Sequence, residues 1–445
     1  MKKLYIKTFG CQMNVYDSSR MRDALRAMGY HETDSPADAD IILLNTCHIR
    51  EKAAEKMYSE IGRMNELKKS RKARGLDTAL IVAGCVVQAG GAELMRRAHA
   101  VDIAVGPQNY HRLPELIARR GSDRLIVADF PTDSKFDFLP QAQAGGAVAY
   151  VAVQEGCDHF CSYCVVPYTR GCEYSRPAKD ILDEVKSLVR TGAKEIMLLG
   201  QNVNGWHGEG KRMDLGDLIR RVAEINGVER IRYTTSYPSE TTCNLIAAHA
   251  DTPKLMPYIH LPIQSGSDKI LKAMNRAYTA AEYERVVAAF RAARPDIAVS
   301  SDFIVGFPDE TEEDFEQTME LVRRVKYAGS FSFKFSARPG TPASLMKNQV
   351  PEAVKTERLK RLQELLLQQQ KAFNQSCVGR EMDVLLTEAG KKAGQLVGYS
   401  PYMQGTVVAA PRTALNTIVR VKITKASATA LTGELISTTQ PKKEK

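Results

Sequence analysis

Hydrophobic and polar positions follow two periods along the chain, which predict strands and helices in turn. Short β-rich runs at 4–9, 41–44 and 79–83 precede stretches with helical apolar spacing, at 18–28, from about 51, and after 84. Gly29 predicts the end of the first helix. This order of strands and helices is typical of a parallel sheet, so residues 1–121 are expected to form an N-terminal parallel-sheet α/β domain.

The same alternation resumes after a stretch at 130–147 that is typical of a linker. Six further strands are expected, with helices between them, at 148–153, 195–199, 230–235, 258–263, 298–304 and 330–335. Six such units predict an open, partial (β/α)6 barrel over 143–375, with its site at the carboxyl ends of the strands. A long amphipathic helix is expected at 351–373, and short β runs predict a small OB-like β-barrel over 376–440.

Composition and charge narrow the class of protein. The 445 residues are 44% hydrophobic and 26% charged, and the longest apolar run, 79–87, is too short to cross a membrane. No apolar stretch typical of a secretion signal follows Met1, so a cytoplasmic protein is expected. The formal charge of +10 lies at the two ends: residues 1–121 carry 20 basic against 14 acidic residues, and 376–445 carry 10 against 5. Basic ends around a neutral centre suggest that accessory domains bind a polyanion.

Three of the nine cysteines follow the first three strands directly. Cys11, Cys47 and Cys85 each stand beside Gly or Thr in the turn that ends a strand. Because parallel strands end at one edge of a sheet, where ligands bind, these thiols are expected to converge. We predict a shared metal site there.

A second set of three cysteines follows the first barrel strand. Cys157, Cys161 and Cys164 form a CxxxCxxC pattern, a compact arrangement of soft ligands. Three ligands leave one iron of a cubane cluster open to a chelating molecule. Zinc is the alternative, with His159 or Cys172 as the fourth ligand.

The chain resembles the radical S-adenosylmethionine methylthiotransferases over nearly its whole length. The similarity rests on both cysteine sets and on the motifs at 165–171, 199–204, 260–267 and 300–308. Among the branches of this family, the sequence is most similar to the tRNA 2-methylthio-N6-dimethylallyladenosine synthases. The C-terminal barrel resembles a TRAM domain.

The resemblance implies cofactors, a reaction and partners. Cys157, Cys161 and Cys164 would hold a [4Fe–4S] cluster that cleaves S-adenosyl-L-methionine to a radical. Cys11, Cys47 and Cys85 would hold an auxiliary [4Fe–4S] cluster that provides sulfur. A second S-adenosylmethionine would donate the methyl group, and the methylthio group would be added to C2 of N6-isopentenyladenosine beside the tRNA anticodon. An electron donor of flavodoxin or ferredoxin type and a sulfur or iron–sulfur carrier are the other expected partners.

Three alternatives stay open at this point. They are methylthiolation of threonylcarbamoyladenosine in tRNA, methylthiolation of a ribosomal-protein aspartate, and a non-enzymatic zinc-bearing RNA-binding module. The basic C-terminal barrel favours RNA over a basic ribosomal protein.

Weaker candidate residues lie at the strand ends and in a basic run. Contacts to S-adenosylmethionine are expected from Gln201, Asn202, Ser236, Gln264 and Asp302. The basic run at 68–74 predicts phosphate contacts, and the only tryptophan predicts a platform for a splayed base. These RNA candidates are Lys68, Lys69, Arg71, Lys72, Arg74 and Trp206.

Overall fold

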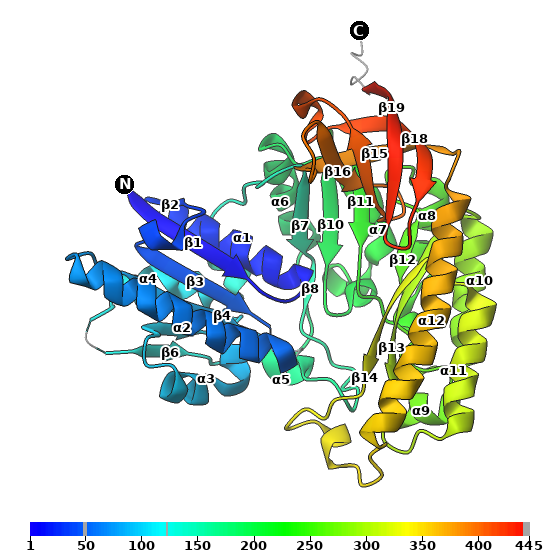
Figure 1. The fold of residues 1–445 in the computed structure, drawn as a ribbon, viewed down its shortest axis with the longest axis horizontal. Helices are drawn as coiled ribbons and strands as arrows, with labels where there is room; N and C mark the ends of the chain where they lie inside the picture. Colours follow the sequence, from blue (N-terminus) through cyan, green and yellow to red (C-terminus); the bar gives the residue numbers. More distant parts are fainter. Residues whose placement is uncertain (48–50, 122, 439–445) are drawn as a thin grey trace. The chain divides into compact units, whose positions relative to one another are not determined.

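The structure is a computed structural model that describes residues 1–47, 51–121 and 123–438. The chain folds into two compact units (Figure 1). Unit 1 comprises Met1–Gln143, Tyr150–Asp158 and Val165–Tyr174. Unit 2 comprises Ala144–Ala149, His159–Cys164 and Ser175–Lys445. The segment with the CxxxCxxC pattern contributes to both units, so the predicted domain limits stay predictions.

Unit 1 contains a six-stranded parallel sheet in the order β2-β1-β3-β4-β5-β6. Every residue of β3 and β4 is buried, because both faces of the sheet are covered. The strands are β1 (Lys2–Thr8), β2 (Tyr30–Glu32), β3 (Ile41–Thr46), β4 (Ala79–Gly84), β5 (Ile103–Val105) and β6 (Leu125–Val127).

Helices cover both faces of this sheet. Apolar residues of α1 and α4 pack on one face, and those of α2 and α3 pack on the other. The first helix begins six residues before the predicted start at Ser18, because buried positions in its first turns carry the polar residues Asn14 and Asp17. The helices are α1 (Gln12–Arg26), α2 (Glu51–Ala73), α3 (Cys85–Arg97), α4 (Leu113–Ala118) and α5 (Val166–Arg170).

The central part of the chain forms six barrel strands, as predicted, in two three-stranded sheets. The strand orders are β11-β10-β7 and β12-β13-β14. The strands are β7 (Val148–Ala152), β10 (Glu195–Leu199), β11 (Arg230–Tyr233), β12 (Tyr258–His260), β13 (Ala298–Val305) and β14 (Gly329–Lys334), and two short strands, β8 (Gln154–Glu155) and β9 (Tyr174–Ser175), pair with each other. The helices of unit 2 are α6 (Ala178–Arg190), α7 (Leu215–Ala223), α8 (Cys243–Asp251), α9 (Asp268–Ala273), α10 (Ala280–Ala293), α11 (Glu312–Val325) and α12 (Glu352–Ser376).

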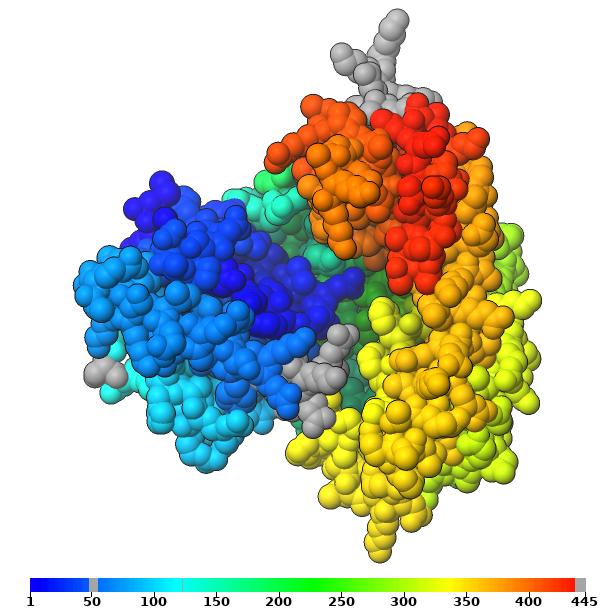
Figure 2. Space-filling view, in the orientation of Figure 1, coloured from blue at the N-terminus to red at the C-terminus, as the bar shows by residue number. Residues whose placement is uncertain are grey.

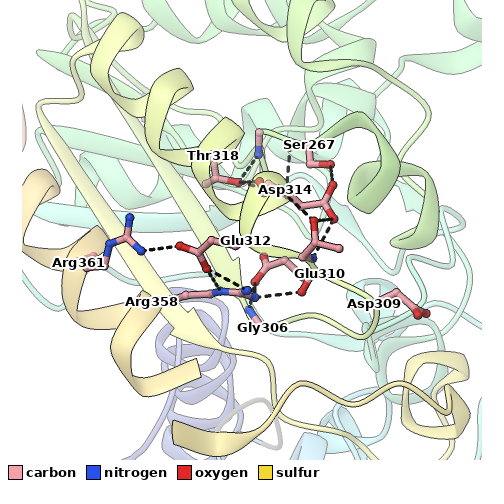
Figure 3. A network of polar contacts seen from close by, with 12 residues as sticks. Ser267, Gly306, Asp309, Glu310, Glu312, Asp314, Thr318, Arg358 and Arg361 are labelled. Carbon is pink, nitrogen blue, oxygen red and sulfur yellow. Dashed lines mark hydrogen bonds and ion pairs between the residues drawn. The ribbon is translucent and has the colours of Figure 1, made fainter. Parts of the chain in front are cut away.

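The long helix α12 buries charged residues beside its leucines. Leu362 and Leu366 are buried as expected, but Lys355 and Arg358 share the buried face. Arg358 donates to the Glu310 carboxylate at 2.8 Å and pairs with Glu312 at 3.2 Å (Figure 3). These ion pairs join α12 to the loop that follows β13 and to the first residue of α11.

A closed five-stranded barrel ends the described chain, in the order β15-β16-β17-β19-β18. Its surface is coloured orange to red in Figure 2. Arg232 attaches it to β11 by donating to the carbonyl oxygens of Ser400 and Pro401, each at 2.7 Å. The strands are β15 (Glu381–Ala389), β16 (Gln395–Tyr399), β17 (Gly405–Ala409), β18 (Ile418–Ala426) and β19 (Ala430–Thr438). Among the helices in the described ranges, none is long and apolar enough to cross a membrane.

Candidate functional site

Three cysteines lie at the carboxyl ends of three neighbouring strands in unit 1. β3 pairs with β1 on one side and with β4 on the other, and the pairing runs to the last residues before the cysteine turns. Cys11 precedes α1, Cys47 follows β3, and Cys85 begins α3. A hydrogen bond from Cys47 lowers the pKa of Cys11 to about 6. Burial opposes this shift, and the positive charge of Arg170 adds to it. The structure therefore brings Cys11 and Cys47 together.

Glycines make room for this approach. Gly10 has φ +120°, and a Cβ built there would lie 2.4 Å from the Cβ of Cys47. Gly84 has φ +101°, and its Cβ would lie 2.4 Å from the carbonyl oxygen of Thr46. Both positions therefore exclude any side chain, which keeps the cysteine turns close to one another.

The donor set at this edge fits a soft iron–sulfur group. Within the described ranges, no three His, Cys, Asp or Glu side chains are gathered tightly enough around one point to hold a single metal ion. Thiolates are the usual ligands of iron–sulfur clusters, so the donor type at this edge of the sheet is compatible with one.

The positive charge that acts on these thiols is that of Arg170. Burial raises the pKa of the Cys85 thiol, and the nearby Arg170 guanidinium opposes that rise through its charge and a hydrogen bond. A fixed cation beside thiols favours their ionised form, which is the form that binds metal.

The second cysteine set lies in the segment between β8 and α5. In unit 1, the N–H of Cys157 donates to the carbonyl of Gly171 at 3.2 Å. In unit 2, the N–H of Cys164 donates to the carbonyl of Cys161 at 2.9 Å, and Arg276 directs Nη1 toward the Cys161 sulfur at 3.6 Å. Within unit 2, two of these thiols and a nearby cation suit an anionic cluster.

His159 contacts residues of other barrel loops in unit 2. Its Nε2 lies 3.1 Å from Oε1 of Glu240, and its ring stacks on Tyr237 with centroids 3.7 Å apart. Asn202 contacts both Glu240 and His159. Burial acts to raise the pKa of Glu240, but hydrogen bonds from His159 and Asn202 outweigh this effect and lower the pKa. Nε2 of His159 is therefore occupied by Glu240, and zinc with His159 or Cys172 as the fourth ligand stays an alternative that metal analysis must decide.

The predicted contacts to S-adenosylmethionine lie at barrel strand ends in unit 2. Gln201 and Asn202 follow β10, and Ser236 follows β11. Gln264 adopts φ +78°, and its N–H donates to the carbonyl of Asp302 at 2.9 Å. The buried Ser236 hydroxyl has no hydrogen-bond partner in the part of the chain that the structure describes, as expected of a group that awaits a ligand. Their role in cofactor binding stays a prediction.

Two predicted RNA contacts are wrong in this structure. Trp206 is 1% exposed and donates from Nε1 to the carbonyl of Arg176 at 2.9 Å, so its ring is core and no platform for a base. Arg71 is 5% exposed and donates to Thr78 and Asp40, so it is not available to a phosphate.

The remaining basic candidates differ in how far their side chains are exposed to solvent. Lys68 is half-buried and pairs with Asp102 at 2.6 Å. The side chains still exposed on the same run are Lys69, Lys72 and Arg74.

Sequence reasoning missed two exposed aromatic side chains. Phe331 and Phe333 on β14 are 57% and 41% exposed. Their partners on β13 are Asp302 and Ile304, so all four share one face of the sheet. The alternation of Phe with Ser or Lys over 330–335 is the signal that could have found them.

Three family models match consecutive parts of the chain. Residues 3–106 match "Uncharacterized protein family UPF0004", residues 151–322 match the "Radical SAM superfamily", and residues 375–436 match the "TRAM domain". This order of domains is that of the methylthiotransferases.

Solved structures share the fold. The radical S-adenosylmethionine methyltransferase TsrM from Kitasatospora setae is 14% identical with a TM-score of 0.59, covering 78% of this chain and 75% of its own. The cobalamin-dependent S-adenosylmethionine radical enzyme OxsB is 12% identical with a TM-score of 0.52, covering 83% of this chain and 56% of its own. Residues 151–322 therefore form a radical SAM domain, and the three matched domains follow the order found in the methylthiotransferases.

Proposed function

We propose that this protein is a tRNA methylthiotransferase that acts on N6-isopentenyladenosine beside the anticodon. The observation that carries the proposal is the pair of three-cysteine sets, one at the ends of β1, β3 and β4 and one at the start of the barrel. Two incomplete ligand sets suit two clusters that each keep an iron open to a further ligand. The TRAM match at 375–436 supports RNA as the substrate.

The chain's residues would hold and shield the cofactors. When bound, the two [4Fe–4S] clusters and S-adenosylmethionine supply the radical, the sulfur and the methyl group. Cys157, Cys161 and Cys164 would hold one cluster, and Arg276 would balance its charge. Cys11, Cys47 and Cys85 would hold the other.

The face of β13 and β14 supports an apolar substituent on the substrate base. Parallel sheets are ordinarily covered on both faces, yet Phe331 and Phe333 stand exposed on this one. Exposed aromatic rings stack well on a splayed base and on a hydrocarbon group. The carboxylate of Asp302, beside Phe331, suits a neutral isopentenyl group better than the anionic threonylcarbamoyl group.

The remaining partners follow from the chemistry of this reaction. Cluster reduction requires an electron donor of flavodoxin or ferredoxin type. The inserted sulfur must be replaced after turnover, which requires a sulfur or iron–sulfur carrier.

The test is a reaction with defined tRNA. The anaerobically reconstituted protein should contain about eight irons, four for each cluster. With reductant and S-adenosylmethionine it should convert isopentenylated tRNA to the 2-methylthio nucleoside, detected by mass spectrometry of the digested RNA. The variant C11A/C47A/C85A is the matched control, which should lose about half of the iron and all of the product. Reaction with threonylcarbamoyl-tRNA only, or stoichiometric zinc without iron, would contradict the proposal.

A further inference from the structure

Four buried charged residues form a closed ring in unit 1. Arg170 donates to Asp17 and to Glu155, each at 2.6 Å. Lys135 donates to Glu155 at 2.7 Å and lies 3.8 Å from Asp17. All four are at most 4% exposed. The ring therefore alternates two cations with two anions, away from water.

The ring joins segments that are far apart in the sequence. Asp17 lies on α1, the helix that Cys11 precedes, and Glu155 lies two residues before Cys157. Lys135 comes from the stretch at 130–147, for which the sequence predicts a linker, and its Nζ also donates to the carbonyl of Pro107 at 2.9 Å. Lys135 is thus buried and paired inside the stretch that the sequence predicts to be a linker.

Arg170 is the ring member that reaches the N-terminal cysteines. It ends α5, which packs against α3, the helix that Cys85 begins, and its charge acts on both Cys85 and Cys11. The next residue, Gly171, accepts the N–H of Cys157, and a Cβ on Gly156 would lie 1.9 Å from the carbonyl oxygen of Cys172. Within unit 1, Gly171 therefore contacts Cys157, and Arg170 provides positive charge to the N-terminal cysteines.

Burying four ions is costly, and apolar residues of similar size would often give equal stability. A satisfied buried network instead fixes one arrangement of the groups that it joins. Here the arrangement holds a cation against thiols. The carboxylates of Asp17 and Glu155 hold Arg170 in place. Their negative charges also cancel part of the positive potential that Arg170 exerts at the cysteines, so this potential depends on an intact ring.

We propose that Arg170 is a positioning residue of the N-terminal cysteine site, and that the ring with Asp17, Glu155 and Lys135 sets the reduction potential of the cluster there. The proposal rests on the proposed function, since it requires a cluster at Cys11, Cys47 and Cys85. A cation near a cluster stabilises its reduced, more negative state. Removing the cation must therefore lower the midpoint potential, and removing a carboxylate of the ring must raise it.

The experiment uses the full chain with the substitutions C157A/C161A/C164A, which leave only the N-terminal cluster. Midpoint potentials are measured by reductive titration followed by electron paramagnetic resonance. We expect R170Q to lower the potential, E155Q to raise it, and R170K to keep it near that of the parent. The matched control is R358Q, which removes another buried arginine that is paired with carboxylates, but in unit 2, and should leave the potential unchanged.

The opposite signs separate an electrostatic role from general damage to the fold. Shifts of the same sign in R170Q and E155Q, or no shift in either, would overturn the inference while leaving the cluster assignment intact. If R170Q binds no iron, the sign of the E155Q shift decides, and an unchanged or lower potential there overturns the inference. Absence of iron from the parent itself would refute the auxiliary cluster, and the inference with it.

Discussion

Gly10 lies against Cys47 so closely that a Cβ on the glycine would stand 2.4 Å from the cysteine Cβ. The substitution G10A must therefore displace the Cys47 turn, and it also places a side chain at φ +120°. We expect G10A to lose most of the N-terminal iron, which is about half of the total. The measurement is iron per chain after anaerobic reconstitution.

The chain provides a matched control for backbone strain. Gly29 also has a positive φ, +83°, but a Cβ there meets no atom within 4 Å. G29A should cost stability through strain alone, on the order of 1 kcal/mol, and keep its iron. Equal iron content in G10A and G29A would show that the close approach to Cys47 does not matter for the site.

Arg232 should hold the C-terminal barrel in place. Besides its two bonds to barrel carbonyls, its Nε lies 3.1 Å from the buried carboxylate of Glu195. The substitution R232M would leave that carboxylate with less compensation, for which we expect a loss of about 3–5 kcal/mol in unfolding free energy. Urea unfolding checks this, with the exposed Arg221→Met as the control, which should lose little. A loss below about 1 kcal/mol would mean that other interactions hold the barrel.

The course of the strands could be predicted from the sequence, but the buried charges could not. β3 and β4 are continuous apolar runs that end in cysteines, so their place in a parallel sheet and the edge that they share follow from pattern alone. Lys135 and Arg71 carry no such signal, because a charged residue in a polar stretch predicts exposure. Each is buried by partners distant in sequence, such as Glu155 for Lys135, and such pairing is not visible to local periodicity. The prediction for Trp206 is wrong for the complementary reason, since a large aromatic side chain in a loop can be core.

Glu310 should make stability depend on pH. Burial raises its pKa to about 7, against the opposing effects of the Gly306 N–H and the Arg358 charge, while Asp314 adds to the rise. A carboxyl that binds its proton more tightly when folded stabilises the protein fully below pH 4, and this contribution disappears as pH rises to about 7. At roughly 1.4 kcal/mol per unit, the loss is about 3 kcal/mol. Urea unfolding from pH 4 to 8 should show this decline in the native protein and not in E310Q, and parallel profiles would contradict it.

The exposed part of the basic run should contribute to RNA affinity through its charge. Lys69, Lys72 and Arg74 are exposed, whereas Arg71 is buried and paired. The variant K69A/K72A/R74A should reduce the slope of log affinity against log salt by roughly 0.7–0.9 for each phosphate that it no longer neutralises. Anisotropy titrations of fluorescently labelled tRNA at several salt concentrations give this slope. R71A should instead lower stability with little change in slope, and an unchanged slope in the triple variant would identify the run as ordinary solvated surface.

Phe331 and Phe333 should distinguish isopentenylated RNA from unmodified RNA. Stacking on an aromatic ring contributes about 1–3 kcal/mol per base, so F331A and F333A should each weaken binding of an isopentenylated anticodon stem-loop several-fold or more. Because the prenyl group needs the same apolar face, the preference for modified over unmodified RNA should fall as well. Ser332 lies between them and points to the opposite face of β14, so S332A is the matched control and should bind both RNAs as the native protein does. Anaerobic binding titrations with the two RNAs measure the preference directly. If F331A and F333A weaken both RNAs equally, the rings support the RNA backbone or the fold and do not recognise the isopentenyl group.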